Sequence, residues 1–226
     1  MASEIQGTDE GIVTMLVDKQ SGELFLYSPI GEDYFGDGIT AEAVIQALDM
    51  LDGKRAIVRI NSPGGDVFTG IAIYNALRRY AGGVDIIIDS LCASIASVIA
   101  LAGKNRTSAK GSMWMIHRAM TFAWGNQDDI GKALAMLQAG DKTMSGIYSE
   151  ATGKDEEEIT KLMSAETWFT ADEAVEFGLA TKTDGVATEK PQVAAWFKNA
   201  PKSLYLGADS RVKPRFPVYR HVSALR

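Results

Sequence analysis

Residues 84–101 read VDIIIDSLCASIASVIAL, and this stretch decides the fold. Its first part, residues 84–89, is a run of apolar side chains that is typical of a buried strand. Small apolar residues follow, and they predict a closely packed helix that begins around Ser94. The strand therefore passes directly into a helix, with one cysteine and three serines near the junction.

The preceding segments repeat this order of elements. Residues 55–60 (RAIVRI) form a continuous apolar strand, which runs through the turn NSPGGD into a helix that stops at Gly82 and Gly83. The order strand, helix, strand, helix implies parallel strands joined by crossover helices. Before them, residues 12–18 and 23–28 predict a β-hairpin, and Thr40 caps a helix that ends near Gly53.

Beyond the quoted stretch, residues 112–117 predict a further short strand, and residues 128–152 predict a long amphipathic helix ended by Gly153. We expect this helix either to pack between subunits or to serve as an ordinary core helix. Two short helices should follow, one behind Asp155 and one behind Thr170. The apolar stripe of the long helix comprises Ile130, Leu134, Leu137, Met144, Ile147 and Ala151.

The periodicity ends near Asp184, which predicts one domain over residues 1–185 and a loosely structured tail over residues 186–226. The net charge of −6 is unevenly distributed, because the tail carries eight Lys and Arg against two acidic residues. The tail is either a solvated extension or a docking segment for an acidic partner. It lacks a dense basic block, so we do not expect nucleic-acid binding.

The composition also restricts the compartment and the metal chemistry. Cys92 is the single cysteine, which excludes an intramolecular disulfide and a multi-cysteine zinc site. No apolar run reaches the roughly 18 residues of a membrane-spanning helix, and the first residues are acidic rather than typical of a secretory signal. We therefore expect a cytoplasmic protein in a reducing environment, without a membrane association.

Histidine is scarce, which narrows the candidates for a general base. The chain has only two histidines, His117 at the end of a predicted strand and His221, five residues before the last residue. A histidine in a tail is rarely held within hydrogen-bonding distance of a nucleophile, so His117 is the candidate base for serine or cysteine chemistry. The alternative is a histidine at a strand end with no chemical role.

Four side chains near the strand-to-helix junction could be the nucleophile: Ser90, Cys92, Ser94 and Ser97. Ser94 fits best, because a nucleophile at a helix N-terminus lies beside free backbone N–H groups that stabilise an oxyanion. Cys92 is expected to be a packing residue, and Ser97 should hydrogen-bond to its own helix. Alternatively, Ser94 is an ordinary helix-capping serine.

Gly64 and Gly65 allow the turn after residue 60 to adopt positive φ and to approach a ligand closely. Two glycines after a strand are weak evidence for a ligand-binding loop, because they also occur in ordinary turns. The spacing of neither common nucleotide-binding loop is present.

Four segments together resemble the Clp-type serine peptidases, and in detail the phage head-maturation (prohead) proteases of that superfamily. They are INSPGGDVFTGIAIYNAL (residues 60–77), LCASIASVIALAG (91–103), MWMIH (113–117) and AETWFTADEAVEFGL (165–179). The resemblance implies a Clp/crotonase-like α/β fold of stacked ββα units. It also implies that Ser94 is the nucleophile, His117 the base, and the N–H groups of Gly65 and Ile95 the oxyanion hole.

Glu166 lies where the resemblance places the triad acid, although Clp peptidases usually carry aspartate there. Asp172 is the next nearest carboxylate, and its place in the first turn of a helix is explained by the helix dipole. A third possibility is that no carboxylate is essential. We expect Glu166 to orient His117, and we expect no metal or cofactor.

The resemblance implies a serine endopeptidase that cleaves scaffold and major capsid proteins during phage head maturation, without ATP, as a homo-oligomer that is expected to be a ring. Its site of action would be the host cytoplasm or the procapsid interior. The alternatives are a housekeeping Clp peptidase fed by an unfoldase, a crotonase-type acyl-CoA enzyme and a non-enzymatic assembly factor. Residues 118–126, with Phe122 and Trp124, are expected to flank the substrate groove.

Overall fold

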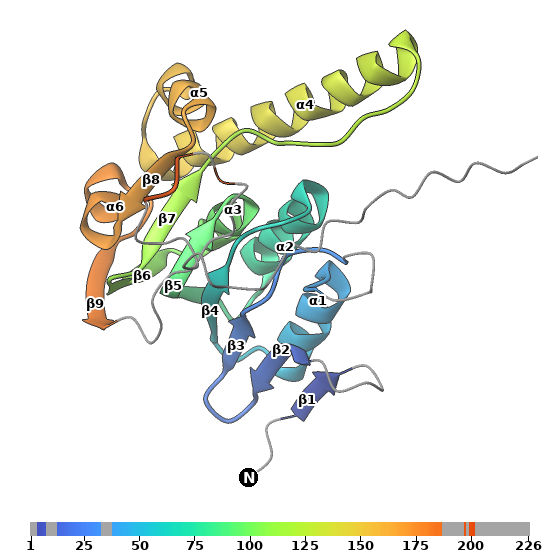
Figure 1. The fold of residues 1–226 in the computed structure, drawn as a ribbon. Helices are drawn as coiled ribbons and strands as arrows, with labels where there is room; N and C mark the ends of the chain where they lie inside the picture. Colours follow the sequence, from blue (N-terminus) through green and yellow to red (C-terminus); the bar gives the residue numbers. More distant parts are fainter. Residues whose placement is uncertain (1–3, 8–12, 33–37, 187–196, 198, 202–226) are drawn as a thin grey trace, which may run out of the picture.

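The computed structural model describes residues 4–7, 13–32, 38–186, 197 and 199–201 of the 226-residue chain. A branched mixed sheet with helices on it forms the body (Figure 1). The strands are β1 (Glu4–Gly7), β2 (Val13–Asp18), β3 (Glu23–Leu26), β4 (Ala56–Ser62), β5 (Val84–Ala93), β6 (Asn105–Lys110), β7 (Met113–Ile116), β8 (Thr167–Thr170) and β9 (Lys182–Val186). The helices are α1 (Ala41–Met50), α2 (Val67–Arg79), α3 (Ile95–Ala100), α4 (Gln127–Thr152), α5 (Glu156–Ser164) and α6 (Ala171–Phe177).

The main path of the sheet runs β1-β2-β3-β4-β5-β6-β9, and β7 and β8 branch from β5. Strands β3, β4, β5 and β6 pair in parallel, as the alternation of strands and helices predicts. One edge of the long strand β5 pairs with β4. Its other edge serves two strands, because residues 85–88 pair with β6 and residues 91–93 pair with β7. On that edge the C-terminal end of β5 therefore lies beside β7 and not beside β6.

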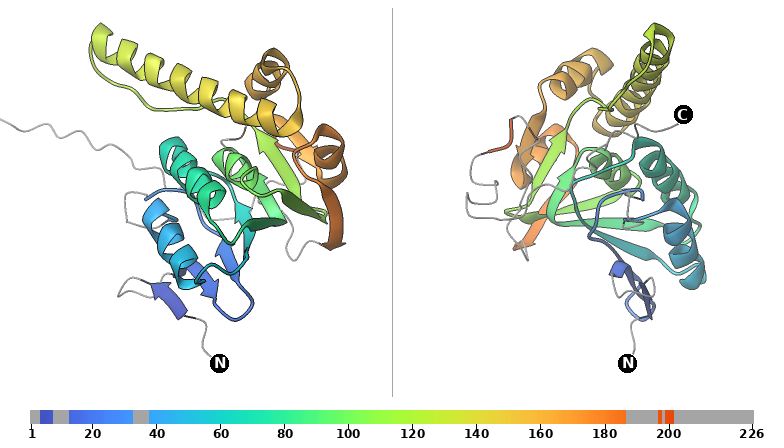
Figure 2. Two further views of the ribbon diagram at one scale, coloured as in Figure 1. Left: turned by 180° about the vertical axis from the view of Figure 1, so that it is seen from behind. Right: turned by 45° about the vertical axis from the view of Figure 1, so that its right-hand side comes forward.

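Helices α1, α2 and α3 cover one face of the sheet, as Figure 2 shows from two further directions. Strand β4 alternates strictly, with Ala56, Val58, Ile60 and Ser62 buried and the residues between them partly exposed. The opposite face carries a smaller apolar cluster around Leu91, Ala93 and Met115. The two faces of β5 and β7 therefore belong to separate apolar clusters.

Helix α4 projects from the body, and residues 117–126 extend alongside it from the end of β7 to its far, N-terminal end (Figures 1 and 2). Its C-terminal half is anchored by the buried side chains of Met144 and Tyr148. Its N-terminal half is exposed, with 44% of Ile130 and 55% of Leu134 accessible. The core-helix interpretation therefore holds only for the C-terminal half of α4.

The predicted elements agree with the structure over most of the domain. The hairpin is present as β2 and β3, Thr40 caps α1, Gly153 ends α4, and Thr170 and Glu173 form a capping box. These elements confirm the predicted Clp/crotonase-like α/β fold class. The sequence does not predict strands β1, β6, β8 and β9, since β1 and β8 are only four residues long and the polar sequences of β6 and β9 carry little apolar periodicity. No helix in the described ranges is long and apolar enough to cross a membrane.

Most of the predicted tail, residues 186–226, lies outside the described residues, and so does His221. The part that is described packs on the body. Phe197 and Ala200 are buried, and they join the cluster of Leu91, Ala93 and Met115. These residues of the predicted tail thus lie beside the end of β5.

Candidate active site

Strand pairing brings Ser94 and His117 together. Ala93, the last residue of β5, pairs with Met115 of β7, and the Ser94 N–H donates to the Met115 carbonyl at 2.9 Å. Each strand ends within two residues of this pair, so the two functional side chains leave the sheet at the same edge. The Nε2 atom of His117 lies 2.7 Å from the Oγ atom of Ser94. This is the contact expected between a general base and a nucleophile.

Ser94 adopts an unusual backbone conformation, with φ 56° and ψ −132°. A non-glycine residue rarely takes positive φ, and such strain occurs often at functional sites. Ser94 occupies the N-cap position of α3, but its side chain makes no capping hydrogen bond. The alternative of an ordinary capping serine is therefore wrong. The backbone N–H of Ile95 belongs to the first turn of α3, whose N–H groups have no partner within the helix.

The Gly64–Gly65 turn lies against Ser94, and both glycines have positive φ, 91° and 152°. A Cβ atom on Gly64 would lie 2.6 Å from the Cβ of Ser94, so no larger residue fits there. Two backbone hydrogen bonds join this turn to Ile30: the Ile30 N–H donates to the Gly64 carbonyl, and the Asp66 N–H donates to the Ile30 carbonyl. The N–H of Gly65 lies between these two groups of the turn in the chain and takes part in neither bond. The positive φ predicted for both glycines is confirmed.

His117 is buried, with 9% of its surface exposed. Burial lowers the pKa of its imidazole below 6.5, while the negative charges of Glu166 and then Asp141 raise that pKa in part. The net shift is downward. His117 is therefore neutral at neutral pH, which is the state that a general base needs.

Glu166 lies beside His117 because of the antiparallel pairing of β7 and β8. Ile116 pairs with Thr167, so the next residues outward are His117 and Glu166. Glu166 is 9% exposed and has a φ of 50°. Its Oε1 atom accepts hydrogen bonds from the Asn199 N–H at 2.7 Å and from Trp168 Nε1 at 3.3 Å. The carboxylate is thus buried near the imidazole and held by two donors.

The other carboxylates differ in their relation to His117. Asp172 is exposed in the first turn of α6. Asp141 of α4 accepts a hydrogen bond from the Ala119 N–H at 2.7 Å and lies 3.9 Å from the Nε of Arg118. Of these carboxylates, Glu166 has the largest electrostatic effect on His117.

The remaining junction residues are fully buried. Burial raises the pKa of the Cys92 thiol well above its usual range, which leaves the thiol protonated and unreactive. Ser90 is also inaccessible, with 1% of its surface exposed. Neither side chain can act as a nucleophile toward a substrate in this conformation.

Ser97 lies one turn inside α3 and connects three parts of the site. Its Oγ atom is 2.6 Å from the Ser94 carbonyl oxygen, 3.3 Å from the Met115 carbonyl oxygen and 2.7 Å from the Tyr148 hydroxyl. The predicted hydrogen bond of Ser97 to its own helix is confirmed. The sequence does not predict Tyr148 as part of the site, because it lies outside the apolar stripe assigned to the long helix and no motif includes it.

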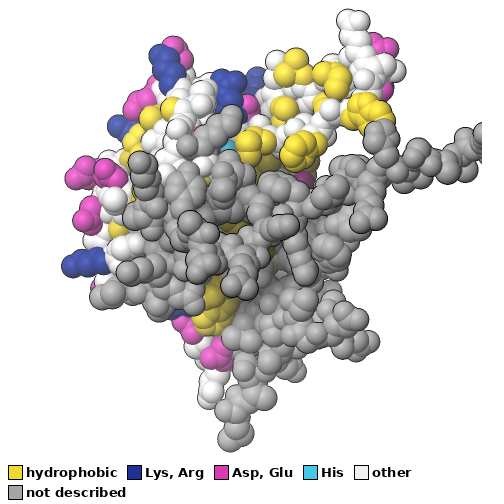
Figure 3. Space-filling view, in the orientation of Figure 1, with side chains coloured by type: hydrophobic (Ala, Val, Ile, Leu, Met, Phe, Trp, Pro, Cys, Tyr) yellow, Lys and Arg dark blue, Asp and Glu magenta, His cyan; other side chains and the backbone are white. Residues whose placement is uncertain are grey.

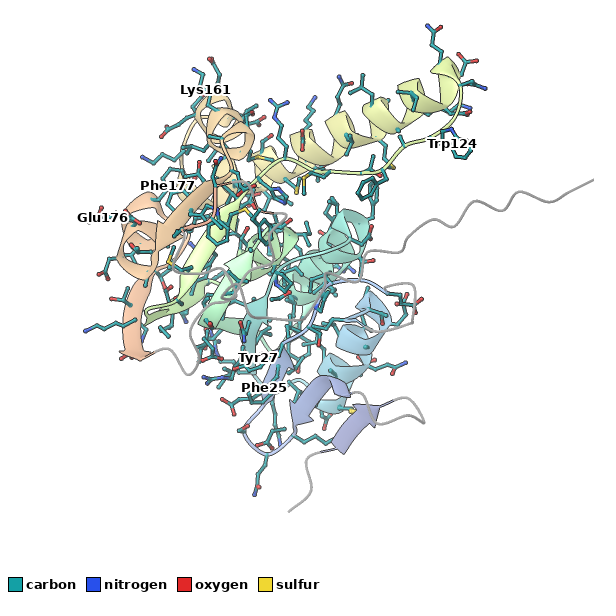
Figure 4. The ribbon with its side chains drawn as sticks, viewed as in Figure 1. Phe25, Tyr27, Trp124, Lys161, Glu176 and Phe177 are labelled. Carbon is teal, nitrogen blue, oxygen red and sulfur yellow. The ribbon has the colours of Figure 1, made fainter. Side chains whose placement is uncertain are left out.

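A cavity of about 120 Å³ opens beside Gly65. The N-terminus of α2, residues 119–121 and α4 enclose it, so the chain after His117 does line a groove next to the site. Its lining is mixed: the side chains of Val67, Phe68, Met120, Met136 and Leu137 are apolar, while Asp66 and Thr121 are polar. Phe122 and Trp124 lie further out, each 88% exposed, and Figure 4 shows Trp124 beside the far end of α4. No three His, Cys, Asp or Glu side chains among the described residues could hold a metal ion together.

Comparison with known proteins agrees with this geometry. A family model described as Clp protease matches residues 9–188. The proteolytic subunit of an ATP-dependent Clp protease from Ligilactobacillus salivarius is 33% identical over 159 residues, covering 68% of this chain and 79% of that protein. The corresponding subunit from Bacteroides fragilis is 33% identical over 159 residues, covering 69% and 75%.

The solved structure of a ClpP1 mutant from Listeria monocytogenes superposes with a TM-score of 0.65 at 23% identity, covering 74% of this chain and 93% of that chain. This likeness supports the fold. None of these relatives is described as a phage head-maturation protease, so the finer part of the resemblance gains no support from them. The family model and the curated relatives show that this chain belongs to the Clp protease family of serine endopeptidases.

Proposed function

We propose that this chain is the proteolytic subunit of a Clp-type peptidase, with Ser94 as nucleophile, His117 as base and Glu166 as the acid that orients His117. The observation that carries the proposal is the 2.7 Å contact between Ser94 Oγ and His117 Nε2. The N–H groups of Gly65 and Ile95 form the oxyanion hole. The names of the relatives favour a peptidase that works with an ATPase over the head-maturation protease expected from the sequence.

The reaction follows from the positions of these groups. Ser94 Oγ attacks the carbonyl carbon of the scissile peptide, and its proton passes to His117 Nε2. The carbonyl oxygen becomes an oxyanion, which the Gly65 and Ile95 amides stabilise. His117 then gives the proton to the leaving amine, and the C–N bond breaks. Water, deprotonated by His117, releases the acyl group and restores Ser94.

The cavity beside Gly65 is suited to a substrate side chain. It adjoins the proposed oxyanion hole, and the large apolar side chains that line it, Phe68, Met136 and Leu137 among them, can contact an apolar residue next to the scissile bond. We therefore expect peptides with leucine, methionine or phenylalanine before the cleaved bond to react faster than peptides with aspartate or lysine there. Enlarging Gly140, which also lines the cavity, to leucine should reduce this preference for large side chains.

The exposed half of α4 supports a homo-oligomer. Figure 3 shows apolar side chains gathered over this helix, and the exposed Trp124 lies beside its far end (Figure 4). A second copy of the chain is the proposed occupant, since the relatives are named as subunits. Leu134→Asp should lower the assembly size in analytical ultracentrifugation, whereas Thr143→Asp, nearer the body, is the matched control. Equal assembly of both variants would contradict this placement.

A fluorophosphonate probe tests the proposed chemistry directly. The intact protein should be labelled at Ser94, and Ser94→Ala should lose both the label and peptide cleavage while keeping its fold. A labelled Ser94→Ala variant would transfer the reactive role to another residue. Cleavage of a folded substrate should require an added ATPase and ATP, while cleavage of an unstructured scaffold segment at equal rate without them would favour the head-maturation role.

A further inference from the structure

Asn199, far beyond the other site residues in the chain, contacts the acid of the proposed triad. Its backbone N–H donates to Glu166 Oε1 at 2.7 Å, and its side-chain amide donates to the Ala165 carbonyl at 2.6 Å. Trp168 Nε1 donates to the same Oε1 atom at 3.3 Å. Two donors from separate segments of the chain therefore meet at one carboxylate oxygen.

Phe197 closes the same side of the site. It is 2% exposed, and its ring meets the rings of His117 and Trp168 edge to face, with centroid distances of 6.1 and 5.6 Å. Ala200 is also buried, and both side chains join the cluster that contains Ala93, the residue before Ser94. This packing fixes the position of Asn199 relative to the strand ends that carry the nucleophile and the base.

Glu166 needs such support for two physical reasons. A glutamate has one more rotatable bond than an aspartate, so more conformational freedom must be lost to hold its carboxylate in one place. Its backbone has a φ of 50°, which is unfavourable for a residue with a side chain. Hydrogen bonds to a charged carboxylate are stronger than those between neutral groups, and they can compensate for both effects.

We propose that Phe197, Asn199 and Ala200 form a C-terminal clamp that positions Glu166 for its role in orienting His117. The Asn199 N–H fixes the carboxylate, and Phe197 keeps water from the contact between acid and base. These are positioning residues, because none of them touches the reacting atoms. The clamp rests on the triad proposed above and assigns a positioning role to Phe197, Asn199 and Ala200, which follow the predicted domain.

The decisive pair of variants changes one residue in two ways. Asn199→Pro removes the backbone N–H that binds Glu166, whereas Asn199→Ala keeps this N–H and removes only the side-chain bond to Ala165. In the full-length protein, Asn199→Pro should lower kcat for a short peptide about tenfold or more, with KM changed less than about twofold. Asn199→Ala should stay within about threefold of the unmodified protein. Equal kcat values for the two variants would overturn the clamp.

The pH profile separates positioning from a general loss of structure. The charged groups around His117 are Glu166, before β8, and Asp141 of α4, which is paired with Arg118. Glu166 raises the pKa of His117. If Asn199→Pro lets the Glu166 carboxylate move away from His117, the pKa of His117 falls and the acidic midpoint of activity moves to lower pH. Partial unfolding would reduce activity without moving this midpoint. An unchanged midpoint would contradict a displaced carboxylate.

Amide hydrogen exchange on the full-length protein gives a test that needs no activity, should Asn199→Pro fail to fold. Exchange at the Asn199 amide should be slow and should accelerate in Glu166→Ala, because the acceptor is lost. Unchanged exchange would overturn the clamp. The two proposals fail differently: a protein that no fluorophosphonate labels contradicts the triad, whereas a labelled protein with unaltered Asn199→Pro activity and exchange contradicts the clamp alone.

Discussion

The hydroxyl of Tyr148 on α4 lies 2.7 Å from the Oγ atom of Ser97 on α3, and Ser97 in turn lies 2.6 Å from the carbonyl oxygen of Ser94. Ser97 and Tyr148 are buried behind the nucleophile. Burial raises the pKa of the Tyr148 hydroxyl, so it remains protonated and able to donate. The helix that projects from the body is therefore linked by hydrogen bonds to the strained peptide of Ser94.

Tyr148→Phe should weaken this link. It removes one buried hydrogen bond, which should cost about 1 kcal/mol of unfolding free energy and lower kcat several-fold because the Ser94 peptide is less restrained. The measurements are chemical denaturation and peptide cleavage. Tyr74→Phe makes the same chemical change on α2, outside this chain of hydrogen bonds, and should leave kcat unchanged. Equal kcat values for both variants would show that the link has no catalytic effect.

Cleavage should rise with pH and reach half its maximum below pH 6.5. Catalysis needs the neutral imidazole, and burial lowers the pKa of His117, so protonation stops the reaction only in more acidic solution. The measurement is kcat/KM for a short peptide between pH 4.5 and 8. A midpoint above pH 6.5 would mean that the nearby carboxylates outweigh burial.

Glu166→Gln should lower kcat by about 100-fold or more, because an amide can present its N–H to His117 and stabilise the wrong ring tautomer. Asp172→Asn should be close to silent, since Asp172 is exposed on α6 and serves only the helix end. Circular dichroism of both variants checks the fold. If Asp172→Asn proves the more damaging change, the assignment of the triad acid is wrong.

Gly64→Ala should abolish both cleavage and fluorophosphonate labelling. A methyl group at this position would lie 2.6 Å from the Cβ of Ser94 and 2.7 Å from the Ala93 carbonyl oxygen, so the turn or the nucleophile must move. Gly53→Ala is the matched control, because Gly53 also has positive φ, 75°, but has nothing within 4 Å of the new group. It should cost about 1 kcal/mol of stability and keep full activity.

Cys92 should resist alkylation in the folded protein. It is completely buried, and its thiol has a raised pKa, so the reactive thiolate is scarce and inaccessible. Mass spectrometry after treatment with iodoacetamide should find no adduct under native conditions and one adduct after denaturation. Rapid native labelling would show that the end of β5 opens in solution.

The sequence predicts Ser94, His117 and the glycine turn because each has a local signature: a strand-to-helix junction, a strand end, and two glycines after a strand. Their convergence depends on the pairing of β5 with β4 and with β7, and Glu166 joins them through the pairing of β7 with β8, which no local pattern in β8 reveals. Glu166 was found only through the resemblance. Tyr148 and Asn199 carry no signal of their own, because one looks like a core residue and the other lies where periodicity has ended.

The packing of Phe197 and Asn199 against Glu166 also bears on when activity begins during synthesis. The ribosome releases the site residues in the order Gly65, Ser94, His117, Glu166 and Asn199, and the strands that unite the first four can fold before the last has emerged. A nascent chain at that stage holds a nucleophile and a base but lacks the donor for its acid. Full proteolytic activity would then arise only after Asn199 has emerged from the ribosome.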